Sequence, residues 1–176
     1  CLGAAVFGDG SVSLAEQVGA LLRQRRRRLA TAESCTGGLL GKMLTDAPGA
    51  SDFYLGGWVV YDNALKSSQL DVPPALLRTA GAVSEATACR MAEGAVQRAA
   101  ADLALAVTGI AGPGGGAPDK PAGTVWIALG ERAGTAVVAR AERRVLGGDR
   151  AAVRDRAAKA ALNILRLRLL DMPAPP

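Results

Sequence analysis

One segment restricts the fold of this chain more than any other. Residues 103–108 form an apolar run, Leu-Ala-Leu-Ala-Val, that ends at Thr108. A strand with one face in water alternates apolar and polar side chains, so this uninterrupted run predicts a strand buried on both faces. Strands of that kind are typical of sheets that carry helices on either side.

The rest of the sequence supplies the other elements of such a sheet. We expect further strands over residues 29–33, 53–62, 124–130 and 135–145, the last two joined as a hairpin by a turn at 131–134. Helices are expected over residues 13–28, 36–45, 63–70, 84–101 and 149–170, with a short one from Pro73-Pro74 to Gly81. Strands that alternate with helices before a terminal hairpin predict a three-layer α/β/α sandwich. We expect a mixed, mostly parallel sheet of about five strands.

Composition sets limits on what this fold contains. At 176 residues the chain fits one domain, whose core we place at about residues 12–170 with both ends frayed. Aromatic residues are only 3%, so the core is expected to be built from small aliphatic side chains. No apolar run reaches the roughly 18 residues that span a bilayer, and no signal peptide is evident. Because the chain begins with Cys1 and not methionine, it is either trimmed or a fragment of a longer protein.

Histidine is absent and the three cysteines are Cys1, Cys35 and Cys89. Without histidine or C-x-x-C spacing, we expect neither a metal site nor a cofactor that depends on one. Free thiols fit a reducing cytoplasm.

The formal net charge is +5, and four arginines follow one another at positions 25–28. This run is either the solvated end of the first helix, where cations interact well with the helix dipole, or a contact for nucleic acid. Nucleic-acid modules usually add aromatic residues or a longer basic stripe, so the first reading is favoured.

The corner at Ser34 is the first candidate site. Ser34, Cys35, Thr36, Gly37 and Gly38 stand where a predicted strand turns into a helix. Without histidine the hydroxyl of Ser34 has no Ser-His-Asp triad, so a base would be a lysine, a carboxylate or a tyrosinate. The N–H groups from Cys35 to Gly38 are candidates for an oxyanion hole. The alternative is that Ser34 only caps the helix.

Two further side chains at this corner allow two readings each. Cys35 is either a thiol activated by the helix start or a small buried hydrophobe. Glu33 is a candidate base, but strand alternation points its side chain away from that of Ser34.

Residues 61–66, Tyr-Asp-Asn-Ala-Leu-Lys, form the second candidate site. Helical spacing places Asn63 and Lys66 on one face. A lysine that is partly desolvated loses its charge easily and can act as a general base, whereas an exposed Lys66 would only solvate a helix. Tyr61 either assists the chemistry or is an ordinary core residue with its hydroxyl at the surface.

Two glycine-containing loops complete the candidates. Thr108 and Gly109 open a glycine-rich loop directly after the buried strand, at the end of a sheet where ligands usually bind. The loop is not a phosphate-binding P-loop because no Gly-Lys-Ser/Thr follows. Arg150 stands in the first turn of the last helix, after two glycines and Asp149. It either binds a phosphate or pairs with a neighbouring carboxylate.

The order of these blocks resembles the CinA C-terminal domain family over about residues 12–170. The matching stretches are Ala-Glu-Ser-Cys-Thr-Gly-Gly at 32–38, Tyr-Asp-Asn-Ala-Leu-Lys at 61–66, Gly-Ala-Val-Ser-Glu at 81–85, Thr-Gly-Ile-Ala-Gly-Pro at 108–113, Lys-Pro-Ala-Gly-Thr-Val at 120–125 and Gly-Asp-Arg at 148–150. Ala122 stands where many members have valine.

This resemblance implies a cytoplasmic amidase that hydrolyses nicotinamide mononucleotide to nicotinic acid mononucleotide and ammonia, without a metal. It implies that Ser34 is the nucleophile, that Lys66 and Tyr61 assist it, and that Arg150 and the loop at Thr108 bind substrate. It also implies the stand-alone form of the amidase, as a homo-oligomer. The alternatives are an amidase for another amide and a non-catalytic module that binds nucleotide or nucleic acid.

Overall fold

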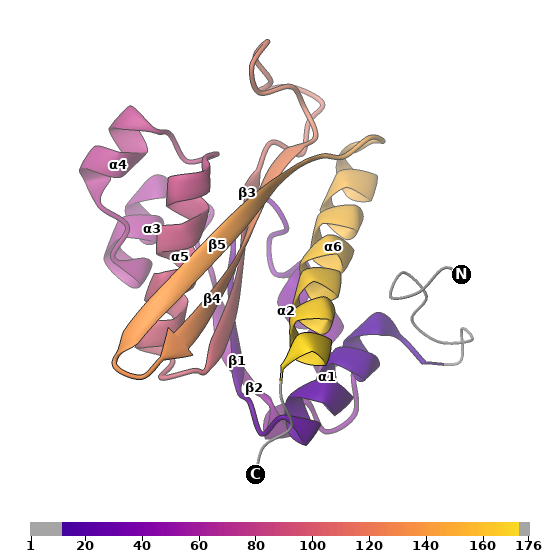
Figure 1. Cartoon of the computed structure of the whole chain (residues 1–176). Coiled ribbons are helices and arrows are strands. Elements are labelled where there is room, and N and C mark those ends of the chain that lie inside the picture. Colours follow the sequence, from indigo (N-terminus) through magenta and orange to yellow (C-terminus); the bar gives the residue numbers. More distant parts are fainter. Residues whose placement is uncertain (1–11, 173–176) are drawn as a thin grey trace.

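The computed structural model describes residues 12–172, which form a five-stranded sheet between two layers of helices (Figure 1). The strand order is β2-β1-β3-β4-β5. The strands are β1 (Leu29–Glu33), β2 (Tyr54–Val59), β3 (Leu103–Gly109), β4 (Thr124–Ala133) and β5 (Ala136–Val145). β1 pairs in parallel with β2 and β3, whereas β3–β4 and β4–β5 are antiparallel.

The helices divide between the two faces of the sheet (Figure 1). One face carries α1 (Leu14–Gln24), α2 (Leu39–Thr45) and α6 (Arg150–Asp171). The other carries α3 (Asn63–Leu70), α4 (Pro74–Thr79) and α5 (Glu85–Arg98). A 3-10 turn, Ala50–Asp52, leads into β2.

The two faces of the sheet are built from side chains of different size. Leu103, Leu105 and Val107 of β3 pack under α1, α2 and α6. The alternate positions, Ala104 and Ala106, face α5. The small residues let α5 lie close to the sheet, which is how a core with few aromatic residues reaches normal packing density.

The predicted elements are confirmed, with differences at their ends. The antiparallel share is larger than expected, because two of the four strand pairs are antiparallel. The hairpin turn is shorter than the predicted 131–134: β4 continues to Ala133 and β5 begins at Ala136, which leaves Gly134 and Thr135 as the turn. Ser13 caps α1 in a reciprocal arrangement with Glu16, and Ser84 caps α5 by accepting the N–H of Thr87. Cys1 and the frayed ends expected at 1–11 and 173–176 lie outside the described residues.

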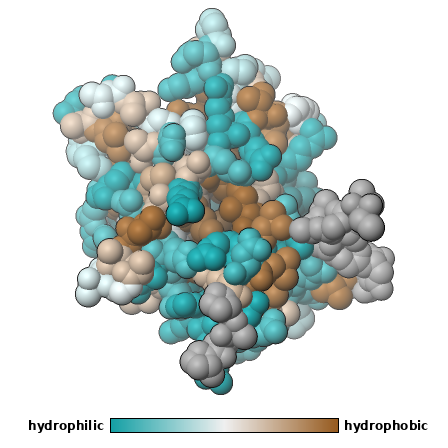
Figure 2. Space-filling view, in the orientation of Figure 1, coloured by the Kyte–Doolittle hydropathy of each residue, from teal (hydrophilic) through white to brown (hydrophobic). Residues whose placement is uncertain are grey.

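α6 packs against β3 and β4, and β5 lies at the edge of the sheet next to β4. Figure 2 shows hydrophobic surface between α6 and β5, and two hollows there are lined by residues that include Leu129, Val138, Leu146 and Ile164. Among residues 12–172 no helix has the length and apolarity needed to cross a membrane.

Candidate functional site

One edge of the sheet collects the predicted site residues. The parallel strands β1, β2 and β3 all end there, and the antiparallel order of β4 and β5 brings the start of α6 to the same edge. β1 lies between β2 and β3, and the connections that leave β1 and β2 cover opposite faces of the sheet. Ligands of α/β proteins usually bind at such a switch point.

The corner after β1 is shaped by Glu33. Its buried carboxylate accepts the N–H groups of Gly38, Leu40 and Gly41 at 3.0, 3.0 and 2.8 Å. These are N–H groups that a helix start leaves without an intrahelical partner, so Glu33 caps α2 from inside the fold.

This arrangement corrects two expectations. α2 begins at Leu39, not at residue 36, and its N-cap position is Gly38, so Ser34 is not the helix cap. Gly37 and Gly38 carry the chain around the corner with φ of 61° and 93°, which other residues rarely adopt.

Contacts within the corner leave fewer N–H groups available for the predicted oxyanion hole. The N–H of Gly37 donates to the Ser34 carbonyl, and that of Gly38 to Glu33. The N–H groups of Cys35 and Thr36 donate to no oxygen among the described residues. Both act to lower the pKa of the Cys35 thiol, whose sulfur is a weak acceptor. Two donors of the corner therefore have no strong acceptor among the described residues, where the sequence suggested four.

Ser34 still follows the geometry of β1. Its N–H donates to the Val107 carbonyl at 2.9 Å, which extends the ladder with β3 by one residue. Strand alternation then directs its side chain to the face where Ala32 lies, the face covered by α3 and α5. Cys35 packs into the core on the opposite face.

Lys66 is buried, with 1% of its surface exposed, and reaches the same corner from α3. The Val60 N–H donates to the Glu33 carbonyl, so a continued parallel ladder would join the Val60 carbonyl to the N–H of Cys35. Instead, Lys66 Nζ donates to the carbonyls of Val60 and Tyr61 at 2.9 and 3.1 Å. The lysine nitrogen thus occupies the Val60 carbonyl at the point where the ladder between β1 and β2 ends.

Burial lowers the pKa of Lys66 from its ordinary value, with Asp62 and Cys35 acting in the opposite direction. A neutral amine has two N–H groups and one lone pair. The two carbonyls accept the two N–H groups, which leaves the lone pair free to take a proton from a third direction.

Tyr61 and Arg150 form the outer part of the site. Tyr61 is 57% exposed, and its hydroxyl accepts a hydrogen bond from Arg150 Nη2 at 2.9 Å. Arg150 also donates through Nη1 to the Gly112 carbonyl at 3.2 Å. Asp149 caps α6 through the Ala152 N–H, so the expected pairing of Arg150 with a carboxylate such as Asp149 is not the one observed. A hollow of about 430 Å³ lies beside Arg150. It is lined by the loop between β3 and β4, which contains Gly112, and by residues that precede α6.

Of the two interpretations of Cys35, the structure favours the small buried hydrophobe. It is 4% exposed, and burial is the main cause that raises its pKa to about 11. A thiol with that pKa is protonated near neutral pH, and the thiolate is the nucleophilic form.

Thr108 and Gly109 contact neighbouring segments at this edge, whereas the Thr36 hydroxyl hydrogen-bonds to none of the described residues. The Thr108 hydroxyl donates to the Ala82 carbonyl at 2.8 Å. At Gly109 a Cβ would lie 2.7 Å from the Thr124 carbonyl oxygen, so β4 requires glycine there. The hydroxyl of Thr36 is buried and has no hydrogen-bond partner among the described residues.

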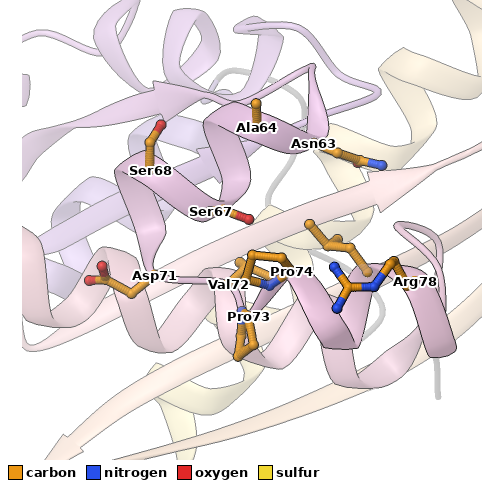
Figure 3. Close-up of a pocket in the computed structure, with 10 residues that line it drawn as sticks. Asn63, Ala64, Ser67, Ser68, Asp71, Val72, Pro73, Pro74 and Arg78 are labelled. Carbon is orange, nitrogen blue, oxygen red and sulfur yellow. The ribbon is translucent and has the colours of Figure 1, made fainter.

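Asn63 lies apart from Lys66, although helical spacing suggested a shared face. It is exposed at the start of α3 and lines a groove of about 780 Å³ between α3 and α4 (Figure 3). The other labelled side chains of α3 in that view are Ala64, Ser67 and Ser68, and Asp71 directly follows the helix. Lys66 does not line this groove and faces the core.

Arg154 was not expected from the sequence to belong to the site. It donates to the Thr36 carbonyl through Nε at 3.2 Å and Nη2 at 2.7 Å. Its spacing of four residues from Arg150 places both on one face of α6, and that spacing is the signal that would have revealed it.

The side chains of two of the four arginines after α1 have partners within the fold. Arg25 Nε donates to the Leu169 carbonyl, and Arg27 pairs with Asp102 at 3.2 Å. Asp102 also accepts the N–H of Arg28. These contacts fit the reading of the run as a helix end. In residues 12–172 no group of three or more metal-ligating side chains gathers.

Comparison with known proteins shows which family has this sequence and fold. The family model described as the CinA C-terminal domain matches residues 11–169. The chain belongs to this family. It is 50% identical over 167 residues to a CinA-like protein of Anaeromyxobacter dehalogenans, covering 95% of this chain and 40% of the relative. A CinA-like protein of Akkermansia muciniphila is 47% identical over 160 residues, covering 91% of this chain and 38% of the relative.

Solved structures of CinA superfamily proteins share the fold. One from Klebsiella pneumoniae 700603 has a TM-score of 0.85 at 37% identity, covering 90% of this chain and 97% of that one. One from Escherichia coli has a TM-score of 0.81 at 35% identity, covering 95% and 98%. The chain therefore spans about two fifths of the curated relatives that it matches, and nearly all of these solved chains.

Proposed function

We propose that this CinA-family domain is an amidase that hydrolyses the carboxamide of nicotinamide mononucleotide to nicotinic acid mononucleotide and ammonia. The observation that carries the proposal is Lys66, a buried amine held by the carbonyls of Val60 and Tyr61. Val60 itself pairs with Glu33, the residue before Ser34. A serine needs a base to become a nucleophile, and the sequence contains no histidine to serve.

The chemistry runs through an acyl-enzyme. Neutral Lys66 takes the proton of Ser34, and the serine oxygen attacks the carboxamide carbon. The N–H groups of Cys35 and Thr36 stabilise the oxyanion. The protonated Lys66, or Tyr61 acting as a relay, gives a proton to the departing ammonia. Water then hydrolyses the ester.

Substrate recognition is assigned to the outer residues. Arg150 lies at the start of a 22-residue helix, where a guanidinium and the helix dipole both favour a phosphate. The glycine-rich loop after Thr108 borders the same region. The family resemblance also implies a cytoplasmic homo-oligomer, and light scattering tests its mass against the 17.9 kDa of one chain.

An ammonia-release assay tests the substrate class. It compares nicotinamide mononucleotide, nicotinamide riboside and nicotinamide for the wild type, Arg150→Ala and the control Arg168→Ala, whose arginine pairs with Glu131 far along α6. We expect the mononucleotide to be preferred. Arg150→Ala should raise its KM by about ten- to a hundredfold, because charged hydrogen bonds contribute about 1.5–3 kcal/mol. No ammonia from any of the three compounds would refute the proposal.

A further inference from the structure

The Ser34–Gly37 corner is held from outside its own chain segment. Arg154, 118 residues away in sequence, places two of its N–H groups on the Thr36 carbonyl. Its Nη2 also lies 3.3 Å from where a Cβ on Gly37 would stand, so the guanidinium packs against the backbone of the corner. Arg154 is half-buried, which limits the freedom of this contact.

We propose that Arg154 is a positioning residue for the reaction at Ser34: it fixes the peptides of the corner and supplies the positive charge that balances Glu33. The inference rests on the proposed amidase function. Arg154 acts on the reaction through its hydrogen bonds to the Thr36 carbonyl.

The geometric part follows from the hydrogen bonds. The Thr36 carbonyl belongs to the peptide whose N–H, on Gly37, closes the turn onto the Ser34 carbonyl. Fixing that carbonyl therefore fixes the turn that carries the N–H groups of Cys35 and Thr36. An oxyanion hole works only if its donors are already aimed when charge develops.

The electrostatic part follows from Glu33. Its buried carboxylate lies directly behind the corner, where it opposes any negative charge that forms on a substrate carbonyl. Lys66 must be neutral to accept the serine proton, and Arg150 is engaged with Tyr61. Arg154 is the cation that contacts the corner itself. Glu33 and Arg154 act in opposite directions on the pKa of the Cys35 thiol. Burial is the main cause that raises this pKa, Glu33 raises it further and Arg154 lowers it.

The test separates this role from a general structural one. Arg154→Ala and Arg154→Lys are compared with the control Arg168→Ala, which also removes an arginine with two hydrogen bonds from α6. Two readouts are taken: kcat and KM for ammonia release from nicotinamide mononucleotide, and the rate at which a fluorophosphonate labels Ser34. Guanidinium at millimolar concentration is added to Arg154→Ala as a rescue.

For Arg154→Ala we expect kcat and the labelling rate to fall about a hundredfold. KM should stay within threefold, and guanidinium should restore part of the rate. Arg154→Lys, with a single point charge, should recover less than half of the loss. Unchanged kcat and labelling in a folded Arg154→Ala would overturn the inference, and so would an equal loss in Arg168→Ala. If the wild type is labelled at Ser34 but releases no ammonia from the mononucleotide, the proposed substrate fails, and the labelling rates alone decide the role of Arg154.

Discussion

At the scale of single residues, the proposed site combines a buried amine, Lys66, with a buried thiol, Cys35. Lys66 and Cys35 are both buried, and burial shifts the pKa of each side chain in the direction that favours its neutral form. For the lysine this shift favours the proposed role of general base, whereas for the cysteine it disfavours the nucleophilic thiolate. The same physical effect therefore assigns opposite roles to the two side chains.

The lowered pKa of Lys66 predicts the pH dependence of the reaction. The base must be neutral, so kcat/KM should rise with pH and level off once Lys66 is deprotonated, at a pH below the 10.5 of a free lysine. The profile is measured by ammonia release between pH 5 and 10 in buffers of constant ionic strength. A rate that does not rise with pH, or that falls from pH 6 upward, would contradict lysine as the base.

The raised pKa of Cys35 predicts that its thiol resists alkylation. At pH 7.5 the native protein should react with iodoacetamide at Cys35 at least roughly a hundredfold more slowly than the urea-unfolded protein, because both burial and protonation oppose the reaction. Peptide mass spectrometry gives the site-specific rates. Cys89, which is half-buried, serves as the internal reference. Rapid native alkylation at Cys35 would restore it as a candidate nucleophile.

At the scale of elements, the position of Lys66 depends on how α3 packs against α5. Gly94 of α5 faces the end of α3, and a Cβ there would lie 2.2 Å from the carbonyl oxygen of Leu70. Backbone atoms cannot yield as a flexible side chain does. The close contact of these two helices is therefore part of what holds the amine at the corner.

Gly94→Ala should lower the free energy of unfolding by about 1–3 kcal/mol, since overpacking forces α3 outward. Urea denaturation measures the loss, and ammonia release should fall as Lys66 moves with α3. Gly114→Ala is the matched control for stability, because a Cβ at that position would have nothing within 4 Å of it. Equal stability of the two variants would show that α3 does not depend on this contact.

Periodicity and end signals predicted most elements because those signals are local. The strand at 29–33, the helix at 63–70 and the caps Ser13 and Ser84 all follow from residues within one turn or strand. The start of α2 was not predicted in this way. Glu33 caps it from β1, and rules for helix ends consider only residues next to the helix start. The contact of Arg154 with Thr36 is also distant in sequence, and only its four-residue spacing from Arg150 pointed to this residue.

At the scale of the whole molecule, the fold concentrates its chemistry on one edge. α6 carries Arg150 and Arg154 to that edge, where they contact the loops after β1, β2 and β3. The arginines at 25–28 lie after α1, and two of them have partners within the fold. Part of the positive charge of this run is thus already paired within the fold.

This distribution predicts weak binding of nucleic acid. In a gel-shift assay at about 150 mM salt, duplex DNA should remain unbound at micromolar protein, because few phosphate contacts are available at once. A salt-dependent shift that disappears when Arg26 and Arg28 are changed to Gln would contradict this expectation. It would favour the alternative of a nucleic-acid module.

The central claim is that Ser34 is the nucleophile of an amidase. The most direct test is ammonia release from nicotinamide mononucleotide by the wild type and Ser34→Ala, with Ser67→Ala as a control that removes a hydroxyl from the outer side of α3. We predict a loss of at least roughly a thousandfold in kcat for Ser34→Ala and wild-type turnover for Ser67→Ala. Normal turnover in a folded Ser34→Ala would contradict the account.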